Sequence, residues 1–171
     1  TFVVPAGTAA GDYEISATAD APFGTTATGT ITATVVAISD IVHHVDCAAE
    51  GTGDGSIGTP YTSLAQLAEA GRFQPGEQIL FRRGATCTGT FAPTGSGLAT
   101  APITVAPYGD GDEAATIGGA GALTGIHLLN VSNWTVDGMR VINPGTPDQR
   151  RVGILYEIND GVTRSGVVLT G

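Results

Sequence analysis

The sequence predicts an all-β chain whose larger part is a solenoid, a coil wound from short strands and turns. The first observation is a stretch of three short β-type runs, at residues 78–82, 88–92 and 102–106, separated by glycine- and proline-rich corners. The second is a repeat of bulky residues in an x-any-x pattern, at sequence offsets of 24, 23 and 28: Ile79/Phe81, Ile103/Val105, Ile126/Leu128 and Ile154/Tyr156. The third is an interleaved series at sequence offsets of 26, 24 and 28: Phe91, Ile117, Val141 and Leu169.

The two series share one period, which lies in the range typical of solenoids. Alternation inside each run gives one inward and one outward face. We therefore expect parallel pairing of residues 79–81, 103–105 and 126–128, with like residues stacked on like. The repeat predicts about four coils, and the last of them has no covering element before Gly171.

Composition excludes some classes of partner. The chain carries a formal net charge of −9 with a pI near 4.4, and its seven cations are all arginine. Nucleic acid is excluded because neutralising phosphates needs a basic face. The acidity indicates solubility in the extracellular medium, with a specific role in cation binding as the alternative. No apolar run is long enough for a transmembrane helix, so the sequence predicts no membrane span and no membrane partner.

Residues 1–37 predict the C-terminal strands of a β-sandwich, a module separate from residues 38–171. Three strand-like stretches, the first closing on Pro5 and the last two separated by a turn at Gly24, are too few to close a sandwich. The motif P-x-G-T-x-x-G-x-Y at residues 5–13 resembles the last hairpin of immunoglobulin-like modules appended to secreted bacterial glycosidases. Alternating threonines in the last stretch indicate a solvent-facing strand: Thr28, Thr30, Thr32 and Thr34. Because the chain opens in mid-pattern, we expect a mature or trimmed piece.

Residues 38–75 predict the start of the solenoid. A linker at residues 37–40 precedes a strand at residues 41–46 and a glycine-rich loop at residues 47–61, in which Asp54 serves the turn. Residues 62–73 form the one predicted helix, with Thr62 or Ser63 as its cap. We expect this helix to cover the first coil from solvent. A helix lining a binding groove is the alternative.

Cys47 and Cys87 lie beside predicted strands, forty positions apart. In an acidic, lysine-free chain rich in glycine and threonine, a disulfide is the first interpretation. Two buried free thiols are an alternative. A metal site is another, for which His43 and His44 are the nearest further ligands in the sequence.

From residue 41 onward the chain resembles a known family. The motifs are VDC…G-x-P-Y-x-S-L-A-x-L…F-x-P-G-E-x-I-L-F-R-R-G-x-x-C-x-G-T…G-S-G…A-P-I-T-V-x-x-Y-G, followed by N-W-T-V-D-G and R-R-x-G-I. They are similar to the opening of secreted right-handed parallel β-helix proteins of the pectate-lyase-like group, common in actinobacteria. The resemblance implies a right-handed parallel β-helix with an N-terminal capping helix, and both cysteines occupy family-like positions. The group includes lyases, hydrolases and proteins with no known activity.

Carboxylates are the candidates for catalysis, because glycoside hydrolysis needs two Asp or Glu residues roughly 5 to 9.5 Å apart. Glu157 ends a predicted strand three residues before Asp160, and we expect these two as the catalytic pair. Arg150 and Arg151 are the candidate substrate-binding residues, because a guanidinium fork suits a uronate carboxylate. Surface pairing with the many acids of the chain is the alternative for both arginines.

Other polar residues carry structural interpretations. The acids of residues 110–113 lack the oxygen spacing of a calcium loop and indicate an exposed corner. Asn130 and Asn143 each end a strand, where their amides satisfy turn backbones. His127 stands alone in an apolar strand and is expected to be a hydrogen-bonded structural histidine. The sequence predicts no metal site, and calcium is the one cofactor left open.

These observations predict the N-terminal portion of a secreted, carbohydrate-active β-helix protein that acts on a polysaccharide as a glycoside hydrolase or lyase. The alternative is a non-catalytic glycan-binding or cell-surface structural solenoid. We expect the main active site in coils beyond Gly171, with the remainder of the chain as a partner of this piece. Residues 1–171 alone are expected to have no strong catalytic activity.

Overall fold

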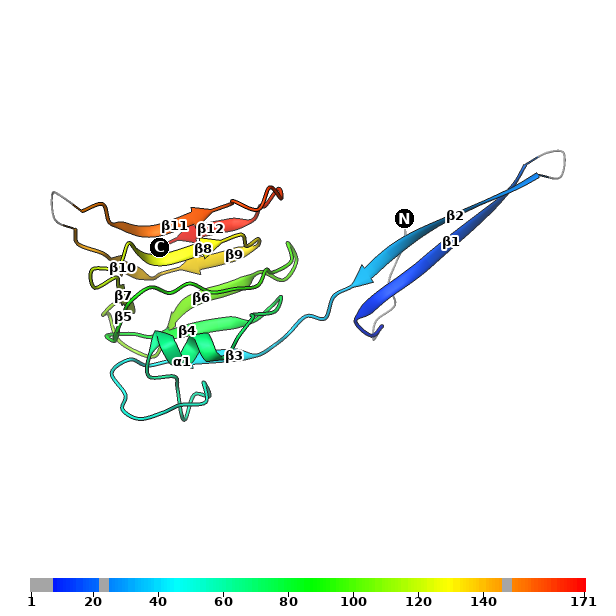
Figure 1. The fold of residues 1–171 in the computed structure, drawn as a ribbon. Coiled ribbons are helices and arrows are strands. Elements are labelled where there is room, and N and C mark those ends of the chain that lie inside the picture. The colour runs from blue at the N-terminus through cyan, green and yellow to red at the C-terminus, as the bar shows by residue number, and fades with distance from the viewer. Residues whose placement is uncertain (1–7, 22–24, 146–148) are drawn as a thin grey trace. The chain divides into compact units, whose positions relative to one another are not determined.

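The computed structural model describes residues 8–21, 25–145 and 149–171. The chain divides after Ala37 into two compact units. In the first unit, β1 (Gly11–Ala21) and β2 (Thr25–Val35) form an antiparallel pair (Figure 1). The four threonines predicted on a solvent-facing strand lie on β2 and are all exposed. The predicted strand at residues 1–5, the turn at Gly24 and the start of the immunoglobulin-like motif lie outside the described residues.

The second unit, Ile38–Gly171, is a parallel β-solenoid of about three turns. Among its described residues, the strands form three sheets, and the strand pairings within them are parallel. The five-stranded sheet contains β3 (Val42–Val45), β4 (Gln78–Arg82), β6 (Ile103–Tyr108), β9 (Trp134–Asp137) and β12 (Val167–Thr170). The three-stranded sheet contains β5 (Thr86–Thr88), β7 (Thr116–Gly118) and β10 (Arg140–Ile142). The third sheet contains β8 (Thr124–Leu129) and β11 (Val152–Glu157), and Phe91 extends it through a bridge to Ile126.

Each turn of the solenoid places one segment in each sheet, as β6, β7 and β8 do in succession (Figure 1). The turns stack from β3 and the helix at one end to β11 and β12 at the other. At that far end, no further strand covers β12 within the described part of the chain. Val168 and Leu169 are therefore 46% and 53% exposed.

The interior is filled by alternate side chains of the strands. Ile79, Val105 and Val136 form one row across β4, β6 and β9, and each is at most 3% exposed. Trp134 is fully buried, and its Nε1 donates a hydrogen bond of 3.0 Å to the carbonyl oxygen of Gly95. Burying one such apolar side chain stabilises the fold by about 1.5–3 kcal/mol, so this interior row is a major source of stability.

The predicted strand pairing is confirmed in part. β4 pairs with β6, although Ile79 lies opposite Val105 and not opposite Ile103 as predicted. In the repeat series, Ile154 lies opposite Ile126 because β11 pairs with β8. The prediction that residues 126–128 lie beside residues 103–105 was wrong, because residues 103–105 belong to β6, which pairs with β9 and not with β8. The chain passes through β7 between β6 and β8, and this extra strand carries β8 onto another face of the solenoid.

The second hydrophobic series was also assigned in part incorrectly. Ile117 pairs with Val141, as predicted, but its other neighbour is Cys87 and not Phe91. The predicted run at residues 88–92 is replaced by β5, which ends at Thr88. Inward-facing residues look alike on every face, so the hydrophobic pattern alone does not assign a residue to a sheet.

The predicted helix exists but is shorter than residues 62–73. Helix α1 spans Leu64–Glu69, and Ser63 is its N-cap, with Oγ accepting the backbone N–H of Gln66 at 3.2 Å. The helix ends early because Gly71 takes a φ of 84° and the chain then pairs with a neighbouring segment. Phe73 donates its backbone N–H to Thr94 and is buried in the interior. Leu64 and Leu67 are buried under the helix, as the predicted capping role requires.

Cys47 and Cys87 form a disulfide with their Cα atoms 5.2 Å apart. This finding confirms the predicted bond over the alternatives of free thiols or a metal site. A disulfide is typical of proteins in an oxidising, extracellular environment. Within the described ranges, no helix is long and apolar enough to cross a membrane.

Candidate functional site

An acid and an imidazole meet on the outer face of the third sheet. Alternation along β8 turns Ile126 and Leu128 inward and leaves His127 outside. Glu157 is the last residue of β11, the strand stacked on β8. His127 Nε2 and Glu157 Oε2 lie 3.1 Å apart, with side chains 25% and 42% exposed. The prediction of a hydrogen-bonded His127 is confirmed, and its partner is the predicted catalytic acid.

Two asparagines hold the other side of the Glu157 carboxylate. Asn159 Nδ2 donates to Glu157 Oε1 at 3.3 Å. Asn130 and Asn159 are joined by two hydrogen bonds, of 2.7 and 2.9 Å. Asn130 takes a φ of 52° at the strand end, in agreement with its predicted turn role. The carboxylate is therefore oriented from both sides by residues of two successive turns.

A second acid–imidazole pair shows why exposure matters. His43 Nε2 and Glu77 Oε2 lie 3.2 Å apart, but their side chains are only 13% and 6% exposed. The His43 ring also packs edge-on against Phe73, with ring centroids 5.2 Å apart. This pair lies inside the fold, and the His127–Glu157 pair is the more exposed of the two.

Asp160 has partners of its own. Its carboxylate pairs with the guanidinium of Arg164 and accepts the backbone N–H of Val162 at 3.1 Å. The hydrogen bond from Arg164 is the main cause that lowers the pKa of Asp160. Asp160 therefore stays ionised to lower pH than a free aspartate. Whether Asp160 and Glu157 share one site stays a prediction.

The two predicted substrate-binding arginines lie at the other end of β11. Arg150 is exposed, and Arg151 donates a hydrogen bond from Nη2 to the side chain of Gln149. The whole extended strand β11 separates Arg151 from Glu157, a distance of roughly 20 Å. One ligand could touch both ends only by running along the strand.

The remaining predicted residues have structural surroundings. Asp54 accepts hydrogen bonds from Thr59 and Ser56, which lower its pKa to about 2, as expected for an acid serving a turn. The Asn143 amide donates to three carbonyl oxygens at 3.0–3.2 Å, as predicted for a corner. The acids of residues 110–113 are exposed. Within the described part of the chain, no group of three or more metal-ligating side chains comes together.

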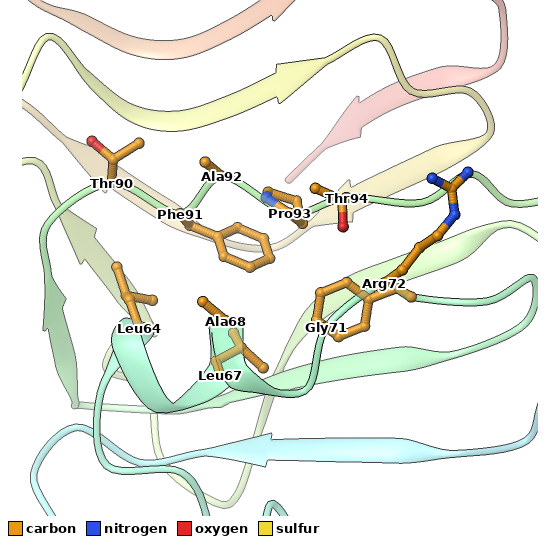
Figure 2. Close-up of a pocket in the computed structure, with 11 residues that line it drawn as sticks. Leu64, Leu67, Ala68, Gly71, Arg72, Thr90, Phe91, Ala92, Pro93 and Thr94 are labelled. Atoms are coloured by element: carbon orange, nitrogen blue, oxygen red, sulfur yellow. The ribbon is translucent and has the colours of Figure 1, made fainter.

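A hollow of about 370 Å³ lies between α1 and the segment at residues 90–94 (Figure 2). Leu64, Leu67 and Ala68 face it from the helix, and Phe91 faces them from the opposite wall. Arg72 is its one charged lining residue. With no acid or imidazole among its lining residues, the hollow offers apolar contact and no acid–base chemistry.

Comparison with known proteins finds structures with a similar fold. No family model and no curated protein matches the sequence. Two crystal structures of GH136 lacto-N-biosidase from Eubacterium ramulus are similar, a selenomethionine derivative with a TM-score of 0.57 at 17% identity and the native protein with 0.52 at 19%. Each match covers 75% of this chain but only 27% and 26% of the other, so this chain spans about a quarter of that protein's length. At such identity the likeness shows a shared β-solenoid fold, and a fold does not by itself imply a function.

Proposed function

We propose that the chain is part of an extracellular, carbohydrate-active β-solenoid protein, and that glycan binds on the outer face of β8 and β11. The observation that carries the proposal is the exposed contact between Glu157 and His127, 3.1 Å long. The solenoid fold resembles that of a lacto-N-biosidase, and the Cys47–Cys87 disulfide supports an extracellular setting. In finer detail, we propose the right-handed coil of the pectate-lyase-like group, preceded by an immunoglobulin-like module in the first unit.

The proposed chemistry is glycoside hydrolysis by two carboxylates. Glu157, held between His127 and Asn159, would act in its protonated form as the general acid and protonate the leaving oxygen as the glycosidic bond breaks. Asp160, whose pKa is lowered by Arg164, would remain ionised and take a proton from the water that attacks the anomeric carbon. Three residues of chain span at most about 10 Å, which is compatible with the separation that hydrolysis needs.

Arg150 and Arg151 are proposed to bind the same glycan further along its chain. Both precede β11, while the carboxylates lie at its end and beyond it. A polysaccharide lying along the strand would present a uronate carboxylate to a guanidinium roughly 20 Å from the reacting bond. A substrate without uronates would not need these two side chains.

The test is a panel of neutral and acidic polysaccharides, assayed for reducing ends and for unsaturated uronates, with residues 1–171 and with a chain extended beyond Gly171, because residues 1–171 alone are expected to show little turnover. Glu157→Gln and Asp160→Asn should each lower turnover by a factor of about 100 or more. The matched control is Asp137→Asn, because Asp137 is an exposed acid on another sheet that bonds Thr170 at 2.7 Å. Turnover unaffected by Glu157→Gln would overturn the proposal, and so would unsaturated products.

Non-catalytic glycan binding is the second candidate. The observation that favours it is that the carboxylates of both Glu157 and Asp160 already have protein partners. In that case the wild-type protein binds glycan without turnover, and Glu157→Gln weakens binding. Absence of binding to the whole panel would overturn both candidates.

A further inference from the structure

A second cluster of polar and aromatic side chains lies on a different sheet. Asp46, Arg82 and Tyr108 stand at the carboxyl ends of three neighbouring parallel strands, β3, β4 and β6. Arg82 lies directly opposite Tyr108, and Val45, just before Asp46, lies opposite Phe81. Since Val45 and Phe81 point inward, their successors along the strands point outward. The three side chains form one row across the outer face of the five-stranded sheet.

Asp46 orients the guanidinium of Arg82. Its Oδ2 lies 3.4 Å from Arg82 Nε, while its Oδ1 accepts the backbone N–H of Ala48 at 3.0 Å. The Asp46 side chain is 12% exposed, and that of Arg82 is 55% exposed. A largely buried acid therefore holds one edge of an accessible guanidinium, whose terminal N–H groups are the ones left for a ligand.

Tyr108 adds an aromatic surface with a polar tip. It lies opposite Arg82 in the register of β4 and β6, and the His44 ring meets its ring edge-on, with the centroids 5.0 Å apart. Burial raises the pKa of Tyr108, and the nearby Asp46 charge raises it further. The phenol is thus neutral at physiological pH, and its O–H can donate a hydrogen bond to a ligand.

The backbone under this row is fixed covalently. Cys47 follows Asp46 directly, and its disulfide partner Cys87 follows Arg82 in the next strand of the same turn. The end of β3 is thereby tied to β5, the strand that follows Arg82, whether or not a ligand is present. Such preorganisation lowers the entropy lost on binding.

We propose that this row, the Tyr108–Arg82 row, binds a neutral sugar unit of a glycan. The C–H face of a pyranose ring packs on the electron-rich face of an aromatic ring, and a guanidinium donates to two adjacent hydroxyls. A neutral ligand fits better than an anion because Asp46 already neutralises Arg82 and the chain carries a net charge of −9. The class of ligand rests on the proposed function, but the row lies on another sheet from Glu157.

The test titrates neutral gluco-, manno- and galacto-oligosaccharides of three to six units into the ¹⁵N-labelled chain, with oligogalacturonate as the anionic comparison. Tyr108→Ala should raise the Kd for the bound neutral sugar about tenfold, and Arg82→Gln several-fold. Tyr108→Phe keeps the ring and should have a smaller effect. Tyr13→Ala is the matched control, since Tyr13 is a 39% exposed tyrosine on a strand of the other unit.

The outcomes separate this site from the one at Glu157. Glu157→Gln should leave shifts around Tyr108 and the Kd for this row unchanged. Neutral-sugar binding that is lost in Glu157→Gln and kept in both Tyr108→Ala and Arg82→Gln would overturn the second site while sparing the first. Tighter binding of oligogalacturonate than of every neutral sugar would overturn the assignment of a neutral ligand, and so would the absence of any neutral-sugar binding. Unfolding temperatures confirm that each variant is folded.

Discussion

Removing the disulfide should destabilise the solenoid by several kcal/mol. Cys47 and Cys87 are separated by 40 positions in the sequence, and for a loop of that size the chain-entropy model gives about 4 kcal/mol at 25 °C. The loop holds α1 and β4, so its closure restrains the first end of the coil in the unfolded chain. In a unit of this size, 1 kcal/mol shifts Tm by about 3–4 °C. The expected fall in Tm is therefore about 12–16 °C.

The assay compares thermal and urea unfolding of the oxidised wild type, the reduced wild type and the Cys47→Ala/Cys87→Ala double variant. Reduction keeps both sulfur atoms in place, so it isolates the loss of the covalent link. The double variant adds the loss of packing at Cys87, which is 2% exposed, and should be less stable still. Native protein should show no thiol that reacts with an alkylating reagent.

Two results would refute this reasoning. A fall in Tm of less than about 3 °C on reduction would mean that the unfolded chain gains little freedom when the link is cut. Two alkylatable thiols in the native protein would mean that the bond is absent. Hydrogen exchange adds a local readout, because the amides of β3, an edge strand, should lose more protection than those of β9, which has a strand on both sides.

Three further outcomes are expected. Gly95→Ala should lower the free energy of unfolding by at least about 2 kcal/mol in urea unfolding, because Gly95 has a φ of 105° and a Cβ there would collide with the backbone carbonyl of Phe73. The control is Gly58→Ala, whose Cβ would meet nothing within 4 Å and which should change the free energy of unfolding by less than about 0.5 kcal/mol. Burial raises the pKa of Tyr61 and Tyr108 above 10.0, so above pH 10 the unfolded chain loses these protons first and the free energy of unfolding falls as pH rises. Replacing both tyrosines by Phe should make the free energy of unfolding depend less on pH in this range. An unchanged dependence on pH would contradict the raised pKa values. Leu169→Asp should reduce concentration-dependent association in sedimentation velocity, because Leu169 is 53% exposed on an edge strand, and equal association would contradict that reason.

A parallel coil could be predicted from the sequence because the hydrophobic repeat keeps a similar spacing from one turn of the solenoid to the next. Ile126 and Ile154, which the repeat places one turn apart, do stack on each other. Alternation within each run also identified the inward side chains, such as Ile79, Phe81 and Val105. Both signals depend only on burial of apolar surface in a strand, which leaves a local pattern in the sequence.

The sheet assignment could not be predicted, because the turns differ in length. Ile79 stacks on Val105, whereas Ile103 stacks on Trp134, and the second of these steps along the chain is the longer one. Loops at the corners absorb the difference, and no local pattern records their length. Counting by an average period can therefore assign a residue to the wrong sheet, as it did when residues 126–128 were placed beside residues 103–105.

The candidate site shows the same limit. Glu157 was found as an acid at a strand end, but sequence proximity paired it with Asp160. Its observed partner, His127, comes from the preceding turn, 30 residues earlier. His127 could have been found by asking which residue of the preceding strand reaches the outer face near Glu157. That question needs the β8–β11 pairing, which agrees with the repeat that places Ile126 and Ile154 one turn apart.

Stacking also sets what size of ligand each site fits. Adjacent strands of a sheet lie about 4.8 Å apart. Glu157 and His127 come from neighbouring strands, so one step separates them, which is close to the advance of one sugar unit along a polysaccharide. Asp46, Arg82 and Tyr108 span two steps, about 10 Å, so one sugar unit with its hydroxyls can contact all three. The first set holds the candidate acid, and the second holds an aromatic ring beside a guanidinium, so a variant in the first should act on turnover and a variant in the second on affinity.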